Sequence, residues 1–382
     1  MKPIDMFVER PVVTRKPDSG LLVSVILLLG LGFVTLYASS QRVGLALQQD
    51  EMYFVKRQLI FGAFGFICML ASACINLKFI RKLTPYVFFG CLLICALTFI
   101  PGIGTDKNGA RRWISIPHVG TFQPSEFAKL AVILFLANLF DKKSERMDEP
   151  MVSTYPAIIG LGMFVFVVIL QKDFTTALTI LLLGLAIFFI AGVYLRWFAL
   201  LLVLGIPVMF LFVFTEEYRV ERVLAWILPN YDMEGMSYQA SAASRAIRSG
   251  GIWGNGLGTG LQYTKYVPEV QSDYIFAGWS EAMGFVGVLL YFAVLAYFCW
   301  RCFSAALSNT DRFRSLIAFG CCFLITGQSV MNCGVVCGAF PSTGIPLPFF
   351  SSGGSSLIVS MIACGLIINT SRYENIVELE DE

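Results

Sequence analysis

Long apolar runs separated by short polar segments dominate the chain. The first run, Leu21–Ser39, contains no charged residue and is long enough to cross the hydrocarbon core of a bilayer as a helix. In lipid, each run must satisfy its backbone hydrogen bonds within itself, which favours helices. The pattern predicts an all-α polytopic integral membrane protein with about ten transmembrane helices: Leu21–Ser39, Leu59–Ile75, Leu83–Ile100, Phe127–Phe140, Pro156–Leu170, Thr175–Gly192, Phe198–Thr215, Tyr274–Cys299, Leu316–Val336 and Leu357–Asn369.

Ten spans place both termini on one side of the membrane. Fifteen of the 28 Lys and Arg residues fall on that side, and five of the others lie in one long segment, 216–273. Long segments translocate largely regardless of charge, so the balance favours cytoplasmic termini. We therefore expect one membrane domain over 1–382, with cytoplasmic tails at 1–20 and 370–382 and a large extracytoplasmic loop at 216–273.

Composition supports a membrane class and excludes others. The chain is 57% hydrophobic and 14% charged, with a mean hydropathy of +0.72, whereas soluble domains are about a quarter charged. The net charge is +2 and basic residues are scattered, which argues against nucleic-acid binding. His118 is the only histidine, which excludes a multi-histidine metal site and a histidine-based catalytic triad.

Asp273 is the first candidate for chemistry. It stands where the polar segment VPEVQSD gives way to an apolar span. A carboxylate at the edge of low dielectric has a raised pKa and is a better general base. The alternative is an ordinary N-terminal cap of the following helix, where Asp is favoured.

Glu126 and Lys129 are the second candidate pair. They lie three residues apart in QPSEFAKLAVILF, so they share one face of a helix that Pro124 is suited to begin. An apolar run follows Lys129 at once, which suits a lysine below the membrane interface and paired with Glu126. A lysine that snorkels from a helix end is the alternative.

Three more groups complete the candidates. Arg111 and Arg112, beside Trp113, lie on the expected outer side, where a cationic pair suits an anionic ligand such as a phosphate or pairs with lipid headgroups. Asp173 lies in a tight turn between two spans. Glu281 is a carboxylate at membrane depth, which marks either a functional group or a buried ion pair.

Glycine-rich GGIWGNGLGTG at 250–260 lacks the surrounding strands of a dinucleotide-binding unit. We interpret it as a tight loop that permits close backbone approach.

Six motifs in this order resemble the SEDS (shape, elongation, division and sporulation) family, whose members include FtsW, RodA and SpoVE. The resemblance runs from about the second span to the last. The motifs are GARRWI at 109–114, FQPSEFAKL at 122–130, QKDFTTA at 171–177, SGGIWGNGLGTG at 249–260, VPEVQSDYIFA at 267–277 and FPSTGIPLPFFSSGGSSL at 340–357.

The resemblance implies a peptidoglycan glycosyltransferase that polymerises lipid II at the outer face of the bacterial cytoplasmic membrane. It implies that Asp273 is the catalytic base and that Glu126 and Lys129 line a central cavity. It also implies a class B penicillin-binding protein, a transpeptidase, as partner among other division proteins. The motif sequences resemble the FtsW branch, which builds the septal wall, more closely than the RodA branch.

The motifs of this chain differ from those of the family at three places. Lys172 replaces a common proline, Gln271–Ser272 replaces a frequent His-Thr, and SEAMG at 280–284 replaces GEELG but keeps Glu281. A divalent cation, Mg²⁺ or Mn²⁺, or the basic candidates would neutralise the pyrophosphate leaving group. A lipid II flippase and a non-catalytic division scaffold remain the alternative functions.

Overall fold

Helices account for nearly all of the predicted spans. The computed structural model describes residues 12–14, 16–107, 110–116, 120–194, 217–228, 236–257, 261–309 and 311–375, with isolated positions between 197 and 214. Nine predicted spans fall on helices, and the tenth, Phe198–Thr215, lies largely outside the described residues. The helices in those spans are α1 (Ser19–Gln48), α2 (Tyr53–Cys74), α3 (Leu77–Leu97), α4 (Pro124–Lys142), α5 (Thr154–Leu170), α6 (Phe174–Ile190), α10 (Ile275–Leu307), α11 (Arg312–Val336) and α12 (Gly354–Thr370).

Local chemistry sets several helix starts. Asp18, Asn76 and Asp311 are N-caps of α1, α3 and α11, and each side chain accepts a hydrogen bond from a backbone N–H in the first turn. α4 begins with Pro124, which suits a first helical position because its missing N–H has no intrahelical partner there. The polar junctions therefore stop and restart the apolar runs.

Burial divides the bundle into central and peripheral helices. α4, α11 and α12 are buried on most sides, whereas α2 and α3 expose most of their apolar surface. Ile60, Ile67 and Phe89 are each more than 60% exposed, which suits a lipid solvent and not water. Among the described helices, five are both long and apolar enough to cross a membrane, and α5, α6 and α12 are shorter apolar helices.

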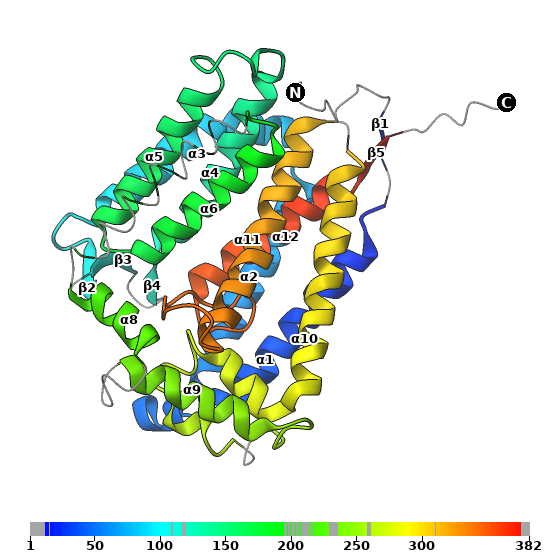
Figure 1. The fold of residues 1–382 in the computed structure, drawn as a ribbon. Helices are drawn as coiled ribbons and strands as arrows, with labels where there is room; N and C mark the ends of the chain where they lie inside the picture. The colour runs from blue at the N-terminus through cyan, green and yellow to red at the C-terminus, as the bar shows by residue number, and fades with distance from the viewer. Residues whose placement is uncertain are drawn as a thin grey trace.

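The first and last described strands lie at one end of the bundle (Figure 1). There β1 (Val12–Thr14) pairs antiparallel with β5 (Tyr373–Asn375), and Asp18 forms an ion pair with Arg301 of α10. The opposite end carries β2 (Gly104–Lys107), β3 (Ala110–Ile116) and β4 (Gly120–Phe122), together with α8 (Glu217–Ile227) and α9 (Met236–Gly250) (Figure 1). We refer to this second end as the site end.

The small β2–β3–β4 antiparallel sheet was not part of the all-α prediction. It is confined to the connection between α3 and α4, and it does not alter the helical fold class. The segment 216–273, expected to be a large loop, also contains regular structure, because α8, α9 and a 3-10 turn (Thr264–Tyr266) lie in it.

The glycine-rich segment packs against a break in α10. Gly284 has a φ of +61° inside α10, so the carbonyls of Glu281 and Ala282 accept hydrogen bonds from Asn255 N and Gly256 N instead of from their own helix. The prediction of close backbone approach is confirmed.

Candidate active site

Asp273 lies where the segment after α9 meets α10. Tyr274 occupies the N-cap of α10, and its side chain makes no cap hydrogen bond. Asp273 is therefore not the capping residue, and that alternative reading is wrong. Its side chain is partly exposed, whereas Gln271 and Tyr274 on either side are buried.

The surroundings of Asp273 favour a basic carboxylate. Burial raises its pKa to about 6, and the negative charge of Glu269 adds to the increase. The guanidinium groups of Arg222 and Arg112 act in the opposite direction, as does a hydrogen bond with Ser272. A carboxylate with this pKa is still mostly ionised at neutral pH, yet it accepts a proton more readily than an ordinary Asp.

The connection between α11 and α12, residues 339–353, folds over this region, and we call it the 339–353 loop. Ser351 Oγ donates to Ser272 O, and Ser352 N donates to Gln271 O at 2.9 Å. Gln58 Nε2 from α2 donates to Ser351 O at 2.9 Å. The loop is thereby attached to both α2 and the residues that precede Asp273.

The other half of the loop lies close to the Asp273 carboxylate. Gly344 has a φ of +74°, and a Cβ placed on it would stand 3.2 Å from Asp273 Oδ2. The neighbouring carbonyl of Thr343 accepts hydrogen bonds from Thr175 Oγ1 at 2.6 Å and Arg222 Nη1 at 3.3 Å. Elements far apart in sequence, α6, α8 and the loop, therefore meet beside Asp273.

Asp173 is the centre of a second polar cluster. It is buried at the N-cap of α6, where Oδ1 accepts a hydrogen bond from Thr176 N at 3.2 Å. Arg112 Nη1 lies 3.3 Å from the same oxygen, and Gln123 Nε2 donates to Oδ2 at 2.8 Å. Arg112 thus joins this cluster to Asp273, whose pKa its charge also lowers.

Glu126 and Lys129 form a buried ion pair, as their spacing suggested. Lys129 Nζ lies 2.7 Å from Glu126 Oε1 and 3.0 Å from Gln328 Oε1. Both charged side chains are at most 5% exposed, so the snorkelling alternative is wrong.

Arg111 and Arg112 do not act as a pair. They are neighbours on β3 where its register with β2 shifts, so that Arg111 is opposite Asp106 and Arg112 is the extra residue of the bulge. Arg112 turns to Asp173, whereas Arg111 is half-exposed and lies 3.5 Å from Asp106 on β2. Trp113 follows on β3, partly buried and opposite Thr105 in the register. Arg112 is thereby brought to another candidate, Asp173.

Glu281 is fully buried and its carboxylate is saturated with hydrogen bonds. It accepts from the backbone N–H groups of Gln262, Tyr263 and Thr264 at 2.7–2.8 Å, and also from the Thr264 hydroxyl. These contacts hold the segment between α9 and Asp273 against α10. They support a structural role, and they differ from the intramembrane ion pair considered as the alternative.

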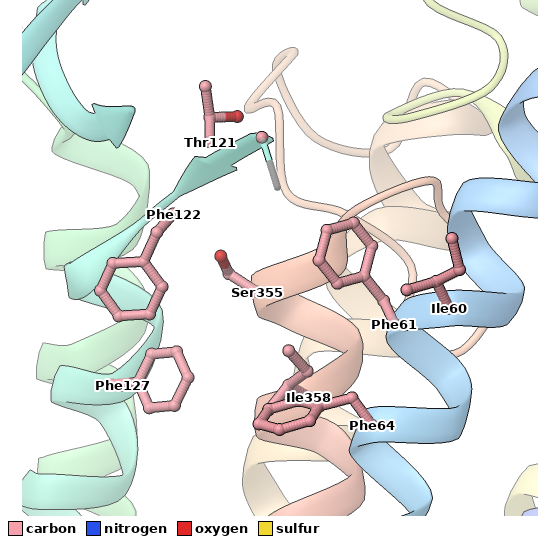
Figure 2. Close-up of a pocket in the computed structure, with 9 residues that line it drawn as sticks. Ile60, Phe61, Phe64, Thr121, Phe122, Phe127, Ser355 and Ile358 are labelled. Carbon is pink, nitrogen blue, oxygen red and sulfur yellow. The ribbon is translucent and has the colours of Figure 1, made fainter. Parts of the chain in front are cut away.

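An apolar groove of about 330 Å³ opens next to the polar clusters. Figure 2 shows Phe122 and Phe127 on one side and Phe61 on the other, with Ser355 and Ile358 of α12 between them. Ser355 Oγ accepts a hydrogen bond from Gln123 N at 3.1 Å, so Gln123 connects the groove to Asp173.

Sequence reasoning missed the amides around these clusters. Gln123 contacts Asp173, and Gln328 and Asn332 of α11 contact Lys129 and the backbone of Asp273. A signal existed, because polar side chains inside an apolar span are unusual and tend to be functional.

A divalent cation would take its protein ligands from the carboxylates near the site. The described residues hold no group of three or more His, Cys, Asp or Glu side chains placed for a metal ion. Mg²⁺, however, is usually bound by only one or two carboxylates together with substrate phosphates. The described carboxylates therefore offer no complete metal site of their own, and a cation would depend on the pyrophosphate of the substrate for its ligands.

Known proteins resemble the chain over nearly its whole length. The FtsW, RodA and SpoVE family model, described as cell cycle protein, matches residues 19–376. A probable peptidoglycan glycosyltransferase FtsW of Geobacter sp. (strain M18) is 33% identical, over 93% of this chain and 96% of that protein. Stage V sporulation protein E of Bacillus subtilis (strain 168) is 35% identical, over 94% and 97%.

Solved structures share the fold. One chain from a structure described as coordinating polymerization and crosslinking by a peptidoglycan synthase complex matches with a TM-score of 0.73 at 26% identity, covering 93% of this chain and 98% of that one. Thermus thermophilus RodA, a rod shape determining protein, matches with a TM-score of 0.68 at 24% identity, covering 93% and 97%. Because the family model and relatives above 30% identity extend over more than nine-tenths of it, this multi-pass membrane protein belongs to the FtsW/RodA/SpoVE family of cell cycle proteins.

Proposed function

We propose that the protein is a peptidoglycan glycosyltransferase that polymerises lipid II into glycan strands. The observation that carries the proposal is Asp273, a carboxylate with a pKa near 6 placed against the 339–353 loop and beside two cationic groups. Similarity to relatives named peptidoglycan glycosyltransferase supports the same reaction.

The reaction joins the 4-hydroxyl of an acceptor sugar to the anomeric carbon of a donor. As the new C–O bond forms, ionised Asp273 takes the hydroxyl proton and the lipid pyrophosphate leaves with the electron pair of the broken bond. General-base help of this kind is worth about 10²–10⁴-fold in rate. The pyrophosphate is already a good leaving group, so the site has to neutralise its charge and does not have to protonate it.

Several groups near Asp273 suit that task. Arg112 and Arg222 carry positive charge close enough to influence Asp273, and Arg fits phosphate oxygens through paired N–H groups. Lys129 is held deeper, by Glu126 and Gln328. A divalent cation such as Mg²⁺ or Mn²⁺, bound with the pyrophosphate, would add further charge neutralisation.

The groove between α2, β4, α4 and α12 suits the polyprenyl chain of the substrate. Its lining is almost entirely apolar, and polar Ser355 and Gln123 lead from it towards Asp173. Arg57 lies beside it, with its guanidinium carbon 5.6 Å from the centre of the Phe61 ring. A lipid tail in the groove would therefore have cationic groups near its pyrophosphate end.

We also propose an orientation, a partner and a cellular role. The termini face the cytoplasm and the site end faces outwards, as the distribution of Lys and Arg favours. A class B penicillin-binding protein acts as partner, which the similarity to a chain of a peptidoglycan synthase complex supports.

Strand synthesis serves the division septum. Depletion should then give filaments without septa, whereas a defect confined to spores would favour the sporulation role of SpoVE relatives.

Polymer formation in detergent separates the proposed reaction from its alternatives. The purified chain, together with its penicillin-binding partner blocked by a β-lactam, is supplied with labelled lipid II, and the products are resolved by gel. A polymerase gives a ladder of uncross-linked strands. A flippase or a scaffold gives no ladder, because detergent removes the two membrane sides and neither forms a glycosidic bond.

The pH dependence of polymerisation should report Asp273. The base must be ionised, and its pKa is raised to about 6, so kcat should fall as the pH decreases through about 6 and stay flat from about 7 to 8. Glu269→Gln removes a charge that raises this pKa, so the acid limb should move to lower pH. An acid limb that is unchanged in Glu269→Gln would contradict the assigned electrostatics.

Filling the groove should weaken lipid II binding. Ile358→Trp places a larger ring in the groove, and Ile67→Trp, on an exposed face of α2 outside it, is the matched control. The larger ring should displace two or three CH₂ groups of the lipid chain from the groove, which corresponds to an increase in KM of about 10–100-fold. The control should keep the wild-type KM, and a lipid II analogue with a short lipid chain should discriminate less between the variants. Equal KM values for both variants with full-length lipid II would exclude the groove as the lipid site.

A further inference from the structure

Two buried amide side chains lie one turn apart on α11. Gln328 and Asn332 are 4% and 1% exposed, and a spacing of four residues puts them on the same helix face. Polar side chains inside a membrane bundle are costly unless they are hydrogen-bonded. The hydrogen-bond partners of the two amides therefore indicate which parts of the structure they hold in place.

Asn332 holds two separate backbone segments together. Its Nδ2 donates to Asp273 O at 2.8 Å and to Ile345 O at 2.7 Å. The first carbonyl belongs to the proposed base itself, and the second belongs to the 339–353 loop. One amide group therefore fixes the distance between the backbone of Asp273 and the loop that lies against it.

Gln328 holds the next residue of the same loop. Its Nε2 donates to Pro346 O at 3.0 Å, and its Oε1 accepts from Lys129 Nζ at 3.0 Å. An ammonium only donates and a carbonyl only accepts, so a flipped amide would lose both bonds. The loop is thereby tied to the Glu126–Lys129 ion pair in one orientation.

The loop segment that both amides hold follows directly on Gly344, which lies close to the Asp273 carboxylate. Gly344 precedes Ile345 and Pro346, and its Cα lies so close that an added Cβ would stand 3.2 Å from Asp273 Oδ2. Movement of residues 344–346 would therefore change the packing of the backbone next to the Asp273 carboxylate.

We infer that Asn332 and Gln328 are positioning residues, which hold Asp273, the 344–346 segment and the Lys129 ammonium in one fixed arrangement for glycosyl transfer. The inference rests on the proposed function, in which Asp273 is the base. Neither amide has to touch the substrate. A displacement of about 1 Å at a reacting group can cost about 10²-fold in rate.

The chain offers a matched control for a purely structural amide. Asn369 of α12 is also buried, and its Nδ2 donates to two backbone carbonyls, Ser72 O at 2.9 Å and Ile75 O at 2.6 Å. It lies near the C-terminal end of α12, at the end of the bundle opposite the site (Figure 1). Asn369→Ala removes the same type of contact without touching the site.

The test compares Asn332→Ala, Gln328→Met and Asn369→Ala in polymerisation with the partner present, together with melting temperatures. We expect kcat to fall about 100-fold in Asn332→Ala and about 10-fold in Gln328→Met, with KM for lipid II within twofold of wild type. Asn369→Ala should lower the melting temperature comparably and keep kcat within twofold. If Asn332→Ala does not yield folded protein, Gln328→Met decides the outcome.

The acid limb of the pH profile gives a readout that lost stability alone does not move. In Asn332→Ala, looser packing around Asp273 should admit water and lower the pKa of its carboxylate. The acid limb of the pH profile should therefore move to lower pH than in the wild type. A wild-type kcat in folded Asn332→Ala or Gln328→Met, or an equal loss of kcat in Asn369→Ala, would overturn the inference. Polymerisation by Asp273→Asn at the wild-type rate would instead refute Asp273 as the base, and no polymer from the wild type would refute the proposed function, so these failures are distinguishable.

Discussion

Replacing Asp273 with Asn should reduce lipid II polymerisation by about 10²–10⁴-fold, the range that a lost general base costs. The amide keeps the shape of the side chain but cannot accept the hydroxyl proton. Asp106→Asn is the matched control, because Asp106 is half-exposed on β2 at the same end of the bundle. The control should retain wild-type polymerisation in the same gel assay.

The same variant should be at least as stable as the wild type at pH 7.5. The folded-state pKa of Asp273, about 6, lies above the ordinary value of 3.8. Its contribution to stability is therefore present in full below pH 3.8 and is lost as the pH rises through about 6. An uncharged Asn avoids that loss, which is worth up to about 3 kcal/mol at pH 7.5. Inactive protein with a clearly lower melting temperature would point to misfolding and not to a missing base.

Removing the Lys129 ammonium should produce the largest loss of stability. Lys129→Met leaves the Glu126 carboxylate buried without its cation, and breaking a buried ion pair in this way costs about 3–5 kcal/mol. The double variant Glu126→Gln, Lys129→Met removes both charges and should recover most of that loss. The measurement is the free energy of unfolding in detergent for both single variants and the double variant, which together give the coupling energy.

The exposed ion pair Asp50–Lys56 provides the matched control for that cycle. Its two charged groups lie 2.8 Å apart, but the side chains are 36% and 63% exposed. Pairs of this kind contribute about 1 kcal/mol or less. A coupling energy for Glu126 and Lys129 that is no larger than that of the exposed pair would contradict the buried arrangement.

The spans could be predicted because lipid imposes a simple constraint on sequence. A segment such as Leu21–Ser39 has to be apolar throughout, and its backbone has to close its own hydrogen bonds. The pairing of Glu126 with Lys129 was equally local, because both lie on one helix turn. The length of each helix was less predictable, and α1 extends to Gln48, beyond the apolar run.

The polar segments were harder to predict, because their structure depends on what they pack against. Sheet β2–β4 forms from residues with no clear apolar alternation, and the amphipathic helices α8 and α9 lie in what reads as a loop. Arg111 and Arg112 looked equivalent in sequence, yet strand geometry sends only Arg112 to Asp173, 61 positions further along.

The loop contacts were out of reach of sequence alone for the same reason. Asn332 meets the carbonyl of Asp273, 59 positions earlier in the chain, and no local pattern indicates that meeting. The unusual presence of amides within the apolar α11 was the one sequence signal that could have indicated them. Tertiary packing of α6, α8, α10 and α11 around the 339–353 loop is what assembles the candidate site.

The most direct test of the central claim is a single-turnover measurement of glycosidic bond formation. Wild-type and Asp273→Asn protein, each saturated with labelled lipid II at pH 7.5 and bound to the partner, are followed from first mixing. With Asp273 as the base, bond formation should be at least 100-fold slower in the variant while lipid II binding is unchanged. Equal rates of bond formation in the two proteins would contradict the claim.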